Sequence, residues 1–265
     1  MREIITNSQA RDVRNLGFCY LCGENFDGAG QKTRDHVPPK GVFRIEDRDW
    51  PLILPACHRC NQQYSYLDQQ AMDLIHLLHP ERSRKFPTGT EEAGIGLRNG
   101  WPVAVLMRGL RPRPVITKII KACHTALYAM VLPSETRHNL QLPFPEFDPQ
   151  TGRPVTPTFY PSPHLICKIL KDNRRIRNVD RIHAYNGKFK FEAVWSKSDC
   201  GRETWAAFAI DLYDWHLLAN DVLGHPQWCV GFYMIGNQPL PPDTSVAPAI
   251  ELGFTWTQPL NPFEE

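Results

Sequence analysis

The apolar positions of the chain change their spacing along its length and predict a mixture of helices and strands. Residues 52–55 form a short apolar run that predicts a strand, which Pro55 is expected to limit. Residues 59–79 contain neither Gly nor Pro, and their apolar positions favour a helix that Pro80 ends. Residues 17–40 are rich in Gly and Pro and predict a metal-binding knuckle, a loop and a short strand.

The middle of the chain predicts one further helix and long irregular segments. Residues 81–100 form a polar link with several glycines, and the apolar run 101–107 predicts a strand. A helix is expected over 115–131, because apolar residues recur at helical spacing after Pro114. Residues 133–163 hold eight prolines and are expected to form an extended, irregular segment at the surface.

The last hundred residues are expected to be rich in strands. The dipeptide Asn186-Gly187 lies between two apolar runs and predicts the turn of a hairpin. Further strands are expected at 229–236 and 251–256, with a helix near 213–223. Since no internal repeat is found, the whole pattern predicts an α+β protein.

Composition and charge add information about compartment and partner. The 265 residues carry a formal net charge of +2. The chain has no run of eighteen apolar residues, so no membrane span is expected. The polar start of the chain lacks the apolar segment of a secretory signal, so we expect a cytoplasmic protein. The small net charge hides a basic middle, 81–132 and 164–190, and an acidic end, 191–265. A basic middle fits a polyanionic partner such as nucleic acid, and it equally fits ordinary solvated surfaces.

Three groups of side chains are candidates for contact with nucleic acid. The segment 168–190 mixes many Lys and Arg with Ile, Tyr and Phe, and the alternative is a basic surface helix that leads into a hairpin. A second candidate patch comprises Arg108, Arg111, Arg113, Lys118 and Lys121. Tryptophan rings can stack on bases, but we expect most of the following to lie in a core: Trp195, Trp205, Trp215, Trp228 and Trp256.

Four of the eight cysteines occur in two Cys-x-x-Cys pairs, Cys19 with Cys22 and Cys57 with Cys60. Each pair puts two sulfurs on one tight turn, and together the pairs offer the four thiolates of a tetrahedral zinc site. In a reducing compartment this spacing favours a metal over disulfides, so we predict one structural zinc ion. The other four are expected to be small buried hydrophobic residues: Cys123, Cys167, Cys200 and Cys229.

The residues between and after the two pairs resemble a known family. Asp35-His36 lies in the segment TRDHVPPKGVF between the pairs, and Asn61 follows the last cysteine directly in LPACHRCN. In this order these elements resemble the zinc-containing branch of the HNH endonucleases, over about residues 17–75. The resemblance implies a ββα-metal module, in which a two-stranded hairpin and a helix clasp one divalent ion. It does not extend to residues 81–265.

The resemblance implies a role for each matching residue. His36 would be the general base that activates water, Asp35 would bind the catalytic ion, and Asn61 would complete the protein ligands of that ion. The chemistry agrees, because a neutral imidazole with an ordinary pKa of about 6.5 accepts a proton near neutral pH. Carboxylate and amide oxygens suit Mg²⁺ or Mn²⁺ better than a soft ion. Two different metals are therefore expected, zinc at sulfur and magnesium or manganese at oxygen.

One position departs from the family pattern. The middle Asn of the family falls at about Leu52 or Ile53 in this chain, and neither side chain can hydrogen-bond the base. Asp47, Asp49 or a backbone carbonyl would have to take its place in orienting His36.

Four more polar residues lie close to the motif in the sequence. Arg34, Lys40 and Arg59 are candidates for contact with phosphates, although exposed Lys and Arg are common in any protein. His58, inside the second Cys-x-x-Cys pair, is expected to face solvent rather than to replace a zinc ligand.

These expectations divide the chain into a zinc-stapled nuclease module over 1–80 and a mixed, strand-rich domain over 101–265 that could bind the target or regulate the module. The first hypothesis is an HNH endonuclease that hydrolyses DNA phosphodiester bonds. One alternative is a zinc-stapled nucleic-acid binder with weak or no catalysis, and another is a ligand-gated nuclease effector of an antiphage defence system. DNA is the expected partner, while RNA, a homodimer and a partner protein stay open.

Overall fold

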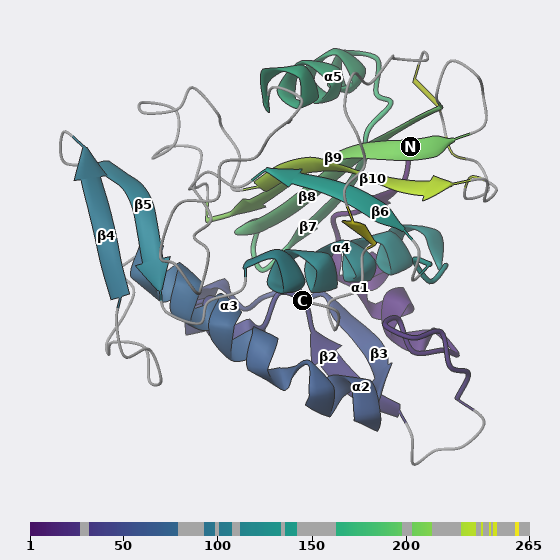
Figure 1. Cartoon of the computed structure of the whole chain (residues 1–265). Helices are drawn as coiled ribbons and strands as arrows, with labels where there is room; N and C mark the ends of the chain where they lie inside the picture. Colours follow the sequence, from purple (N-terminus) through teal and green to yellow (C-terminus); the bar gives the residue numbers. More distant parts are fainter. Residues whose placement is uncertain are drawn as a thin grey trace.

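The structure of the protein is a computed structural model. It describes the following residues: 1–26, 32–78, 93–98, 101–107, 112–133, 136–141, 163–197, 203–213, 229–236, 240, 244, 246–247 and 258–259. Helices and strands are mixed in these ranges (Figure 1), which confirms the predicted α+β class. No helix within them combines the length and the apolar character that crossing a lipid bilayer requires.

A mixed seven-stranded sheet is the largest part of the fold, with the strand order β1-β7-β8-β9-β10-β6-β11. Strand β1 runs parallel to β7, and the other neighbouring strands pair antiparallel. Every residue of β9 is buried, as expected for a central strand that is covered on both faces. The strands are β1 (Glu3–Ile4), β6 (Arg137–Gln141), β7 (Asp180–Ala184), β8 (Phe189–Lys197), β9 (Thr204–Leu212), β10 (Cys229–Gly236) and β11 (Gln258–Pro259).

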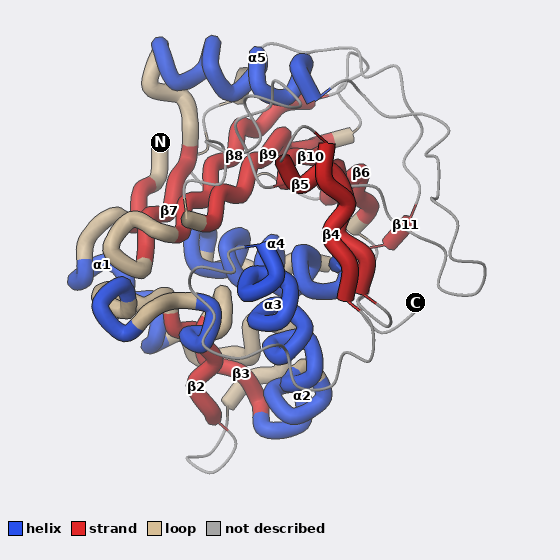
Figure 2. The backbone as a smooth tube through the Cα atoms, turned by 90° about the vertical axis from the view of Figure 1, so that its left-hand side faces the viewer, coloured by secondary structure: helices blue, strands red, loops and turns tan. Residues whose placement is uncertain are grey.

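Helices cover both faces of this sheet (Figures 1 and 2). Helix α5 (Pro163–Arg175) packs on one face, where Ile166 and Leu170 join Trp205 and Phe232 in a buried cluster. Helix α4 (Pro112–Tyr128) packs on the opposite face. Positions 114–125 of α4 are all buried, because this helix lies between the sheet and a second unit.

The second unit holds the cysteine pairs and lies on the far side of α4 from the sheet (Figure 1). Strand β2 pairs antiparallel with β3, and two helices follow directly, so the chain order is strand, strand, helix. Its elements are α1 (Asn7–Asp12), β2 (Lys32–His36), β3 (Ile53–Cys57), α2 (His58–Gln63) and α3 (Ser65–Leu78), with 3-10 turns at Val13–Asn15, Lys40–Val42 and Ile45–Asp47. A separate hairpin comprises β4 (Ala93–Arg98) and β5 (Trp101–Met107).

Several predicted elements are confirmed. The strands at 101–107 and 229–236 form as β5 and β10. Asn186-Gly187 lies in the turn between β7 and β8, and both residues adopt positive φ, 55° and 78°, as the hairpin signal requires. The long helix expected after the second cysteine pair forms as α2 and α3, which meet at Tyr64.

Three other expectations need correction or cannot be compared. Pro55 does not end its strand, because β3 continues to Cys57 and the Pro55 carbonyl accepts a hydrogen bond from Tyr20 N at 3.1 Å. The expected link at 81–100 contains strand β4, and the proline-rich stretch contains strand β6. The strand expected at 251–256, and all but the first residue of the helix near 213–223, lie outside the described residues.

The two predicted parts of the chain share one buried core. Side chains of the cysteine-bearing unit, such as Tyr20 and Leu54, belong to the same buried cluster as Phe191 and Tyr233 of the sheet. Strand β1, which precedes the unit in the chain, is an edge strand of the large sheet. The division into a module over 1–80 and a domain over 101–265 stays a prediction.

A chain of buried hydrogen bonds fixes α4 on the sheet. The Trp195 indole donates to Tyr128 Oη at 2.8 Å, and the Tyr128 hydroxyl donates to Asp180 Oδ2 at 2.8 Å. His124 Nδ1 lies 3.3 Å from Tyr233 Oη, and burial lowers the pKa of His124 to about 3, so this imidazole stays neutral. Trp195 and Trp205 are fully buried, as expected for core residues.

Tyr128→Phe removes the central hydroxyl of this chain and leaves Asp180 and Trp195 short of a partner. Urea unfolding should therefore show a loss of about 1–3 kcal/mol in the free energy of unfolding. Tyr66→Phe is the matched control, because Tyr66 is 44% exposed. Equal midpoints and slopes for both variants would contradict this account of how α4 is held.

Candidate functional site

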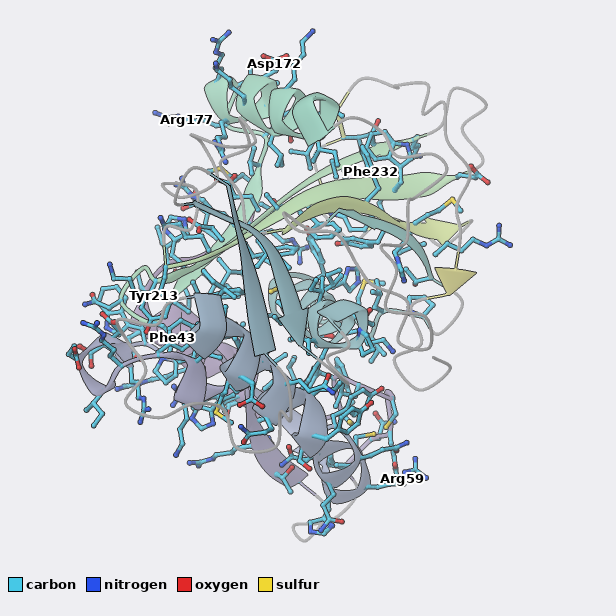
Figure 3. The ribbon with its side chains drawn as sticks, turned by 60° about the vertical axis from the view of Figure 1, so that its left-hand side comes forward. Phe43, Arg59, Asp172, Arg177, Tyr213 and Phe232 are labelled. Carbon is cyan, nitrogen blue, oxygen red and sulfur yellow. The ribbon has the colours of Figure 1, made fainter. Side chains whose placement is uncertain are left out.

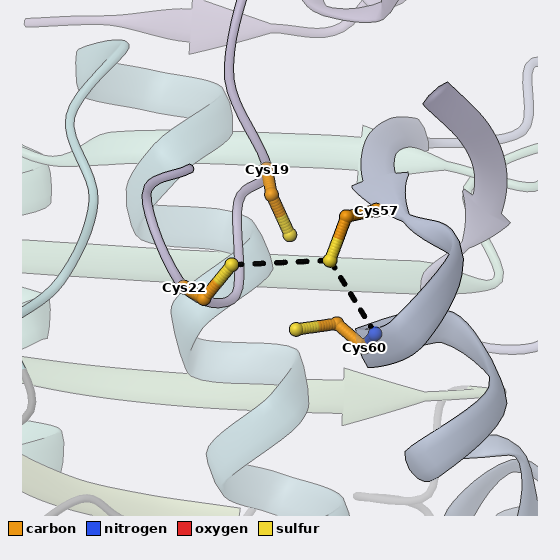
Figure 4. Close-up of side chains that lie close together, drawn as sticks. All are labelled: Cys19, Cys22, Cys57 and Cys60. Atoms are coloured by element: carbon orange, nitrogen blue, oxygen red, sulfur yellow. Dashed lines mark hydrogen bonds between the residues drawn. The ribbon is translucent and has the colours of Figure 1, made fainter. Parts of the chain in front are cut away.

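The first cysteine pair lies on a tight turn that the sequence dictates. Gly23 adopts a φ of +78°, a conformation that suits glycine, and its amide donates to the Cys19 carbonyl at 2.8 Å. The Cys19 amide donates in turn to the Glu24 carbonyl at 2.8 Å. These bonds close the loop on itself and turn the sulfurs of Cys19 and Cys22 to the same side (Figure 4).

The second cysteine pair lies where strand β3 passes into helix α2. Cys57 is the last residue of β3 and the N-cap of α2, and its sulfur accepts a hydrogen bond from the Cys60 amide at 3.4 Å. The next helical turn brings the Cys60 sulfur to the same side. The predicted zinc ligands therefore come from one loop before the hairpin and one strand–helix junction after it.

The four sulfurs fit a zinc ion. All of them lie within 4.8 Å of one another, and Cys22 Sγ is 3.9 Å from Cys57 Sγ. Four sulfurs at the usual Zn–S distance of about 2.3 Å in a tetrahedron would be about 3.8 Å apart. Three of the cysteines are buried, Cys22 is exposed, and His58 faces solvent as predicted. Among the described residues this is the one cluster of three or more Cys, His, Asp or Glu with metal-binding geometry.

The thiols need a cation to become thiolates together. Burial raises the pKa of Cys19 to about 11 and also raises the pKa of Cys60. Burial also opposes ionisation of Cys57. Hydrogen bonds to its sulfur, first from Cys60 and then from Cys19 and Cys22, lower the pKa of Cys57 overall. A zinc ion binds thiolates and stabilises them, so the donor set suits metal binding that is coupled to folding.

A buried lysine lies in the electrostatic field of the cluster. Lys121 of α4 is only 5% exposed. Burial lowers its pKa, while the sulfurs of Cys60, Cys22 and Cys19 act in the opposite direction. A zinc ion with four thiolates carries two net negative charges, so the Lys121 ammonium offsets part of a charge that would otherwise be buried without compensation.

Asp35 faces the interior at the end of β2. Its side chain is 4% exposed, and its Oδ2 accepts a hydrogen bond from the Tyr20 hydroxyl at 2.7 Å. Lys118 Nζ of α4 lies 3.0 Å from the same oxygen and 2.5 Å from Asp68 Oδ1 of α3. Burial raises the pKa of Asp68 to about 6, Lys118 opposes that rise, and Asp35 adds to it.

This arrangement does not fit a divalent ion at Asp35. The carboxylate oxygen that would bind the ion already contacts an ammonium and a phenol, and Lys118 is 2% exposed. Asn61 follows Cys60 on α2 and is half-buried, with no hydrogen bond to a described residue. The structure therefore pairs the Asp35 carboxylate of β2 with Lys118 of α4.

His36, the last residue of β2, lies in a positive environment. Its imidazole is half-buried and makes no hydrogen bond to a described residue. Burial lowers the pKa of His36, the cations Lys40, Arg14 and Arg34 lower it further, and Asp35 acts in the opposite direction. A neutral imidazole beside three cationic side chains can accept a proton next to a bound anion.

The position of the missing Asn is apolar in the structure. Leu52 and Ile53 are both buried, and the Leu52 carbonyl accepts from the Val37 amide at 3.0 Å. The Asp49 carbonyl accepts from the Asn186 amide. Neither Asp47 nor Asp49 hydrogen-bonds the His36 ring, so no described side chain takes over the orienting role.

The other predicted contacts with nucleic acid divide into exposed and buried groups. Arg34 and Lys40 are exposed near His36, whereas Arg59 is exposed on α2 and pairs with Glu24 at 3.7 Å. Lys118 and Lys121 of the second candidate patch are buried and cannot contact a nucleic acid in this arrangement. Arg108 and Arg111 of that patch lie outside the described residues.

Reasoning from the sequence missed three site residues, Arg14, Tyr20 and Asp68, and it placed Lys118 in a patch for nucleic acid rather than beside Asp35. Asp68 is 24% exposed and lies beside the buried Leu67 of α3, so the spacing of buried positions did not single it out. Lys118 had a usable signal, because a helix with apolar residues on every side must bury its lysines. Arg14 and Tyr20 carry no such signal.

No protein-family model, no curated protein and no solved structure matches this chain.

Removing one ligand should release the zinc ion. Cys57→Ser is expected to abolish stoichiometric zinc, measured by mass spectrometry under native conditions, and to lower the melting temperature, because metal binding contributes to folding. Cys123→Ser is the matched control, since Cys123 is buried but lies outside the cluster. Zinc retained in full by Cys57→Ser would refute the four-thiolate site.

Removing the neighbouring ammonium should weaken zinc retention without removing a ligand. Lys121→Met is expected to release zinc to a chromogenic chelator about tenfold faster than wild type, which is a common size for effects of groups next to a metal site. Lys171→Met on the exposed side of α5 is the control. Identical release rates for the two variants would mean that Lys121 does not stabilise the cluster.

Proposed function

We propose that the chain is a nuclease of the HNH type that hydrolyses phosphodiester bonds of DNA. The observation that carries the proposal is the neutral, half-buried imidazole of His36 with Arg14, Arg34 and Lys40 around it. A proton acceptor among cations suits a polyanionic substrate. The chain order of hairpin and helix, stapled by cysteines at both ends, gives further support.

In this proposal each residue near His36 has a separate role in the reaction. His36 takes a proton from the attacking water as the water oxygen bonds to phosphorus and the bond to the leaving oxygen breaks. Arg34 and Lys40 hold the phosphate against the end of β2, where their positive charges also oppose the negative charge that develops in the transition state. Asn61 offers an amide at the start of α2 for the same phosphate or for a cation bound to it.

The exposed cations of α5 lie at the opposite end of the molecule from Arg59 of α2. The exposed cations of α5 and its C-terminal turn include Lys168, Lys171, Arg175 and Arg177. Figure 3 shows Asp172 and Arg177 at one end of the molecule and Arg59 at the other. A contact with Arg59 and a contact with the cations of α5 would therefore be separate contacts.

A second candidate function is nucleic-acid binding without hydrolysis. Two observations favour it: the Asp35 carboxylate is neutralised by Lys118, and the position of the middle Asn is apolar. The exposed cations near His36 would then serve binding alone. Mutation of His36 separates the two candidates, because a binder has no use for a proton acceptor.

Plasmid nicking tests the proposed base. Wild type with Mg²⁺ or Mn²⁺ is expected to nick supercoiled DNA slowly, and His36→Ala should lower the rate by about 10²–10⁴-fold, the usual contribution of a general base. His58→Ala is the matched control, because His58 is exposed and outside the site. Equal nicking by wild type and His36→Ala would remove the base, and no nicking by any protein would favour the binder.

The pH dependence of nicking tests the environment of His36. Because burial and the nearby cations lower its pKa, His36 is neutral at pH 7, and the rate should fall only below the ordinary pKa of about 6.5. Lys40→Ala removes one of the cations that lower the pKa and should shift the acidic limb to higher pH. An unchanged limb in Lys40→Ala, with Lys171→Ala as the control, would contradict the assignment of that limb to His36.

A further inference from the structure

Helix α5 carries a row of cations on the side that faces away from the sheet. Lys168, Lys171 and Arg175 are exposed, and their spacing of three and four residues places them on one face of the helix. The one acidic residue of α5 is Asp172, which Figure 3 shows on the side of the helix away from the sheet. The turn after the helix adds the exposed Arg177. These four cations, called the outer face of α5 below, therefore keep a net positive charge.

The stability of the helix does not account for the lysines of this row. Arg174 is a different case, because its Nε donates to Glu192 Oε2 of β8 at 2.8 Å and ties the end of α5 to the sheet. The negative end of the helix dipole favours cations in the last turn, but Lys168 and Lys171 lie before that turn. Cations four residues apart, such as Lys171 and Arg175, repel each other and destabilise a helix. A bound polyanion would remove this repulsion.

The backbone that carries the row is held firmly. Ile166 and Leu170 are buried on the sheet side of α5. At the end of the helix the Asn173 side-chain amide donates to the Ile169 carbonyl at 2.9 Å, and the Asn178 amide donates to the Asn173 carbonyl at 2.9 Å. A partner that meets these cations therefore does not have to order the helix first, which lowers the entropic cost of binding.

The chemistry of the outer face fits the backbone of a nucleic-acid duplex. Lys168 and Arg175 are seven residues apart, which is about 10 Å along the helix axis. Each strand of a duplex advances about 3.4 Å per phosphate, so the row can face about three phosphates of one strand. The exposed residues of α5 include no aromatic ring on which unpaired bases could stack.

A lipid surface fits the same face less well. A helix that lies on a membrane inserts an apolar face, and the apolar face of α5 is buried against the sheet. Ile176 is 68% exposed just after the helix, but a single side chain does not make an apolar face. The observations therefore favour contact with phosphates over insertion into lipid.

We propose that the outer face of α5 is a second nucleic-acid contact, which binds the phosphate backbone of a DNA duplex without reading its sequence. The inference rests on the proposed function only for the class of partner, because a nuclease and a binder without catalysis would both meet DNA. The structure also narrows the basic segment 168–190 to α5 and the turn after it. Tyr185 and Phe189 of that segment are buried and take no part.

The test is the salt dependence of duplex binding by the zinc-loaded full chain, without Mg²⁺ or Mn²⁺. Fluorescence anisotropy follows a labelled duplex of about twenty base pairs between about 50 and 200 mM salt. Changing Lys168 and Lys171 together to Gln should weaken binding about tenfold and reduce the slope of log affinity against log salt concentration by about 1.8, because each phosphate contact contributes about 0.9. Lys168→Gln alone should reduce the slope by about half as much.

Two controls separate this contact from a general effect of charge. Changing Lys168 and Lys171 together to Arg keeps both charges and should keep the slope of wild type. Lys197→Gln removes one charge from an exposed lysine at the end of β8 and should also leave the slope unchanged. All of these variants alter exposed side chains, so equal melting temperatures should show that the loss of binding is not a loss of folding.

The outcomes are distinguishable from those of the nicking assay. Equal slopes for wild type and the double Gln variant would overturn the α5 contact, whatever His36→Ala does to nicking. A reduced slope in a protein that never nicks DNA would support the α5 contact and count against the nuclease. Binding to phosphatidylserine vesicles that the double Gln variant loses, with unchanged duplex binding, would make α5 a membrane contact and overturn the inference.

Discussion

Two buried lysines of helix α4, Lys118 and Lys121, constrain how the rest of the structure packs. Helix α4 is covered by the large sheet on one side and by the cysteine-bearing unit on the other, yet it carries Lys118 and Lys121. Their ammonium groups need partners of opposite charge because burial without them is costly. The carboxylates of Asp35 and Asp68 meet one, and the sulfurs of the cysteine cluster lie near the other. Only a few arrangements of the cysteine-bearing unit on α4 keep both Lys118 and Lys121 next to groups of opposite charge.

A zinc ion at the cysteine cluster and helix α4 would stabilise the hairpin from different directions. The cysteines join the loop before β2 to the junction after β3, so an ion there ties the two ends of the hairpin together. Lys118 ties the open end of β2 to α3 through Asp35 and Asp68. The unit would gain rigidity from both, and this rigidity would hold His36 at the end of β2.

Local signals in the sequence predicted the features that depend on neighbouring residues. The Cys-x-x-Cys spacing predicted the sulfur cluster, and Asn186-Gly187 predicted the turn between β7 and β8. Features that depend on distant residues were not predictable in this way. Nothing near Asp35 in the sequence points to Lys118, which is 83 positions later. Likewise, no local signal showed that the Pro55 carbonyl accepts a hydrogen bond from Tyr20, 35 positions earlier. The seven-stranded order likewise depends on long-range pairing that alternation alone leaves open.

The parallel pairing of β1 with β7 has a consequence for folding order. The Arg2 amide donates to Asp180 Oδ1 across 178 residues of chain, and the whole cysteine-bearing unit lies within that span. Closing so long a loop costs configurational entropy, and the cost falls when the intervening chain is already compact. The outermost strand of the sheet is therefore expected to join last, after a metal-stapled unit has shortened the path between its partners.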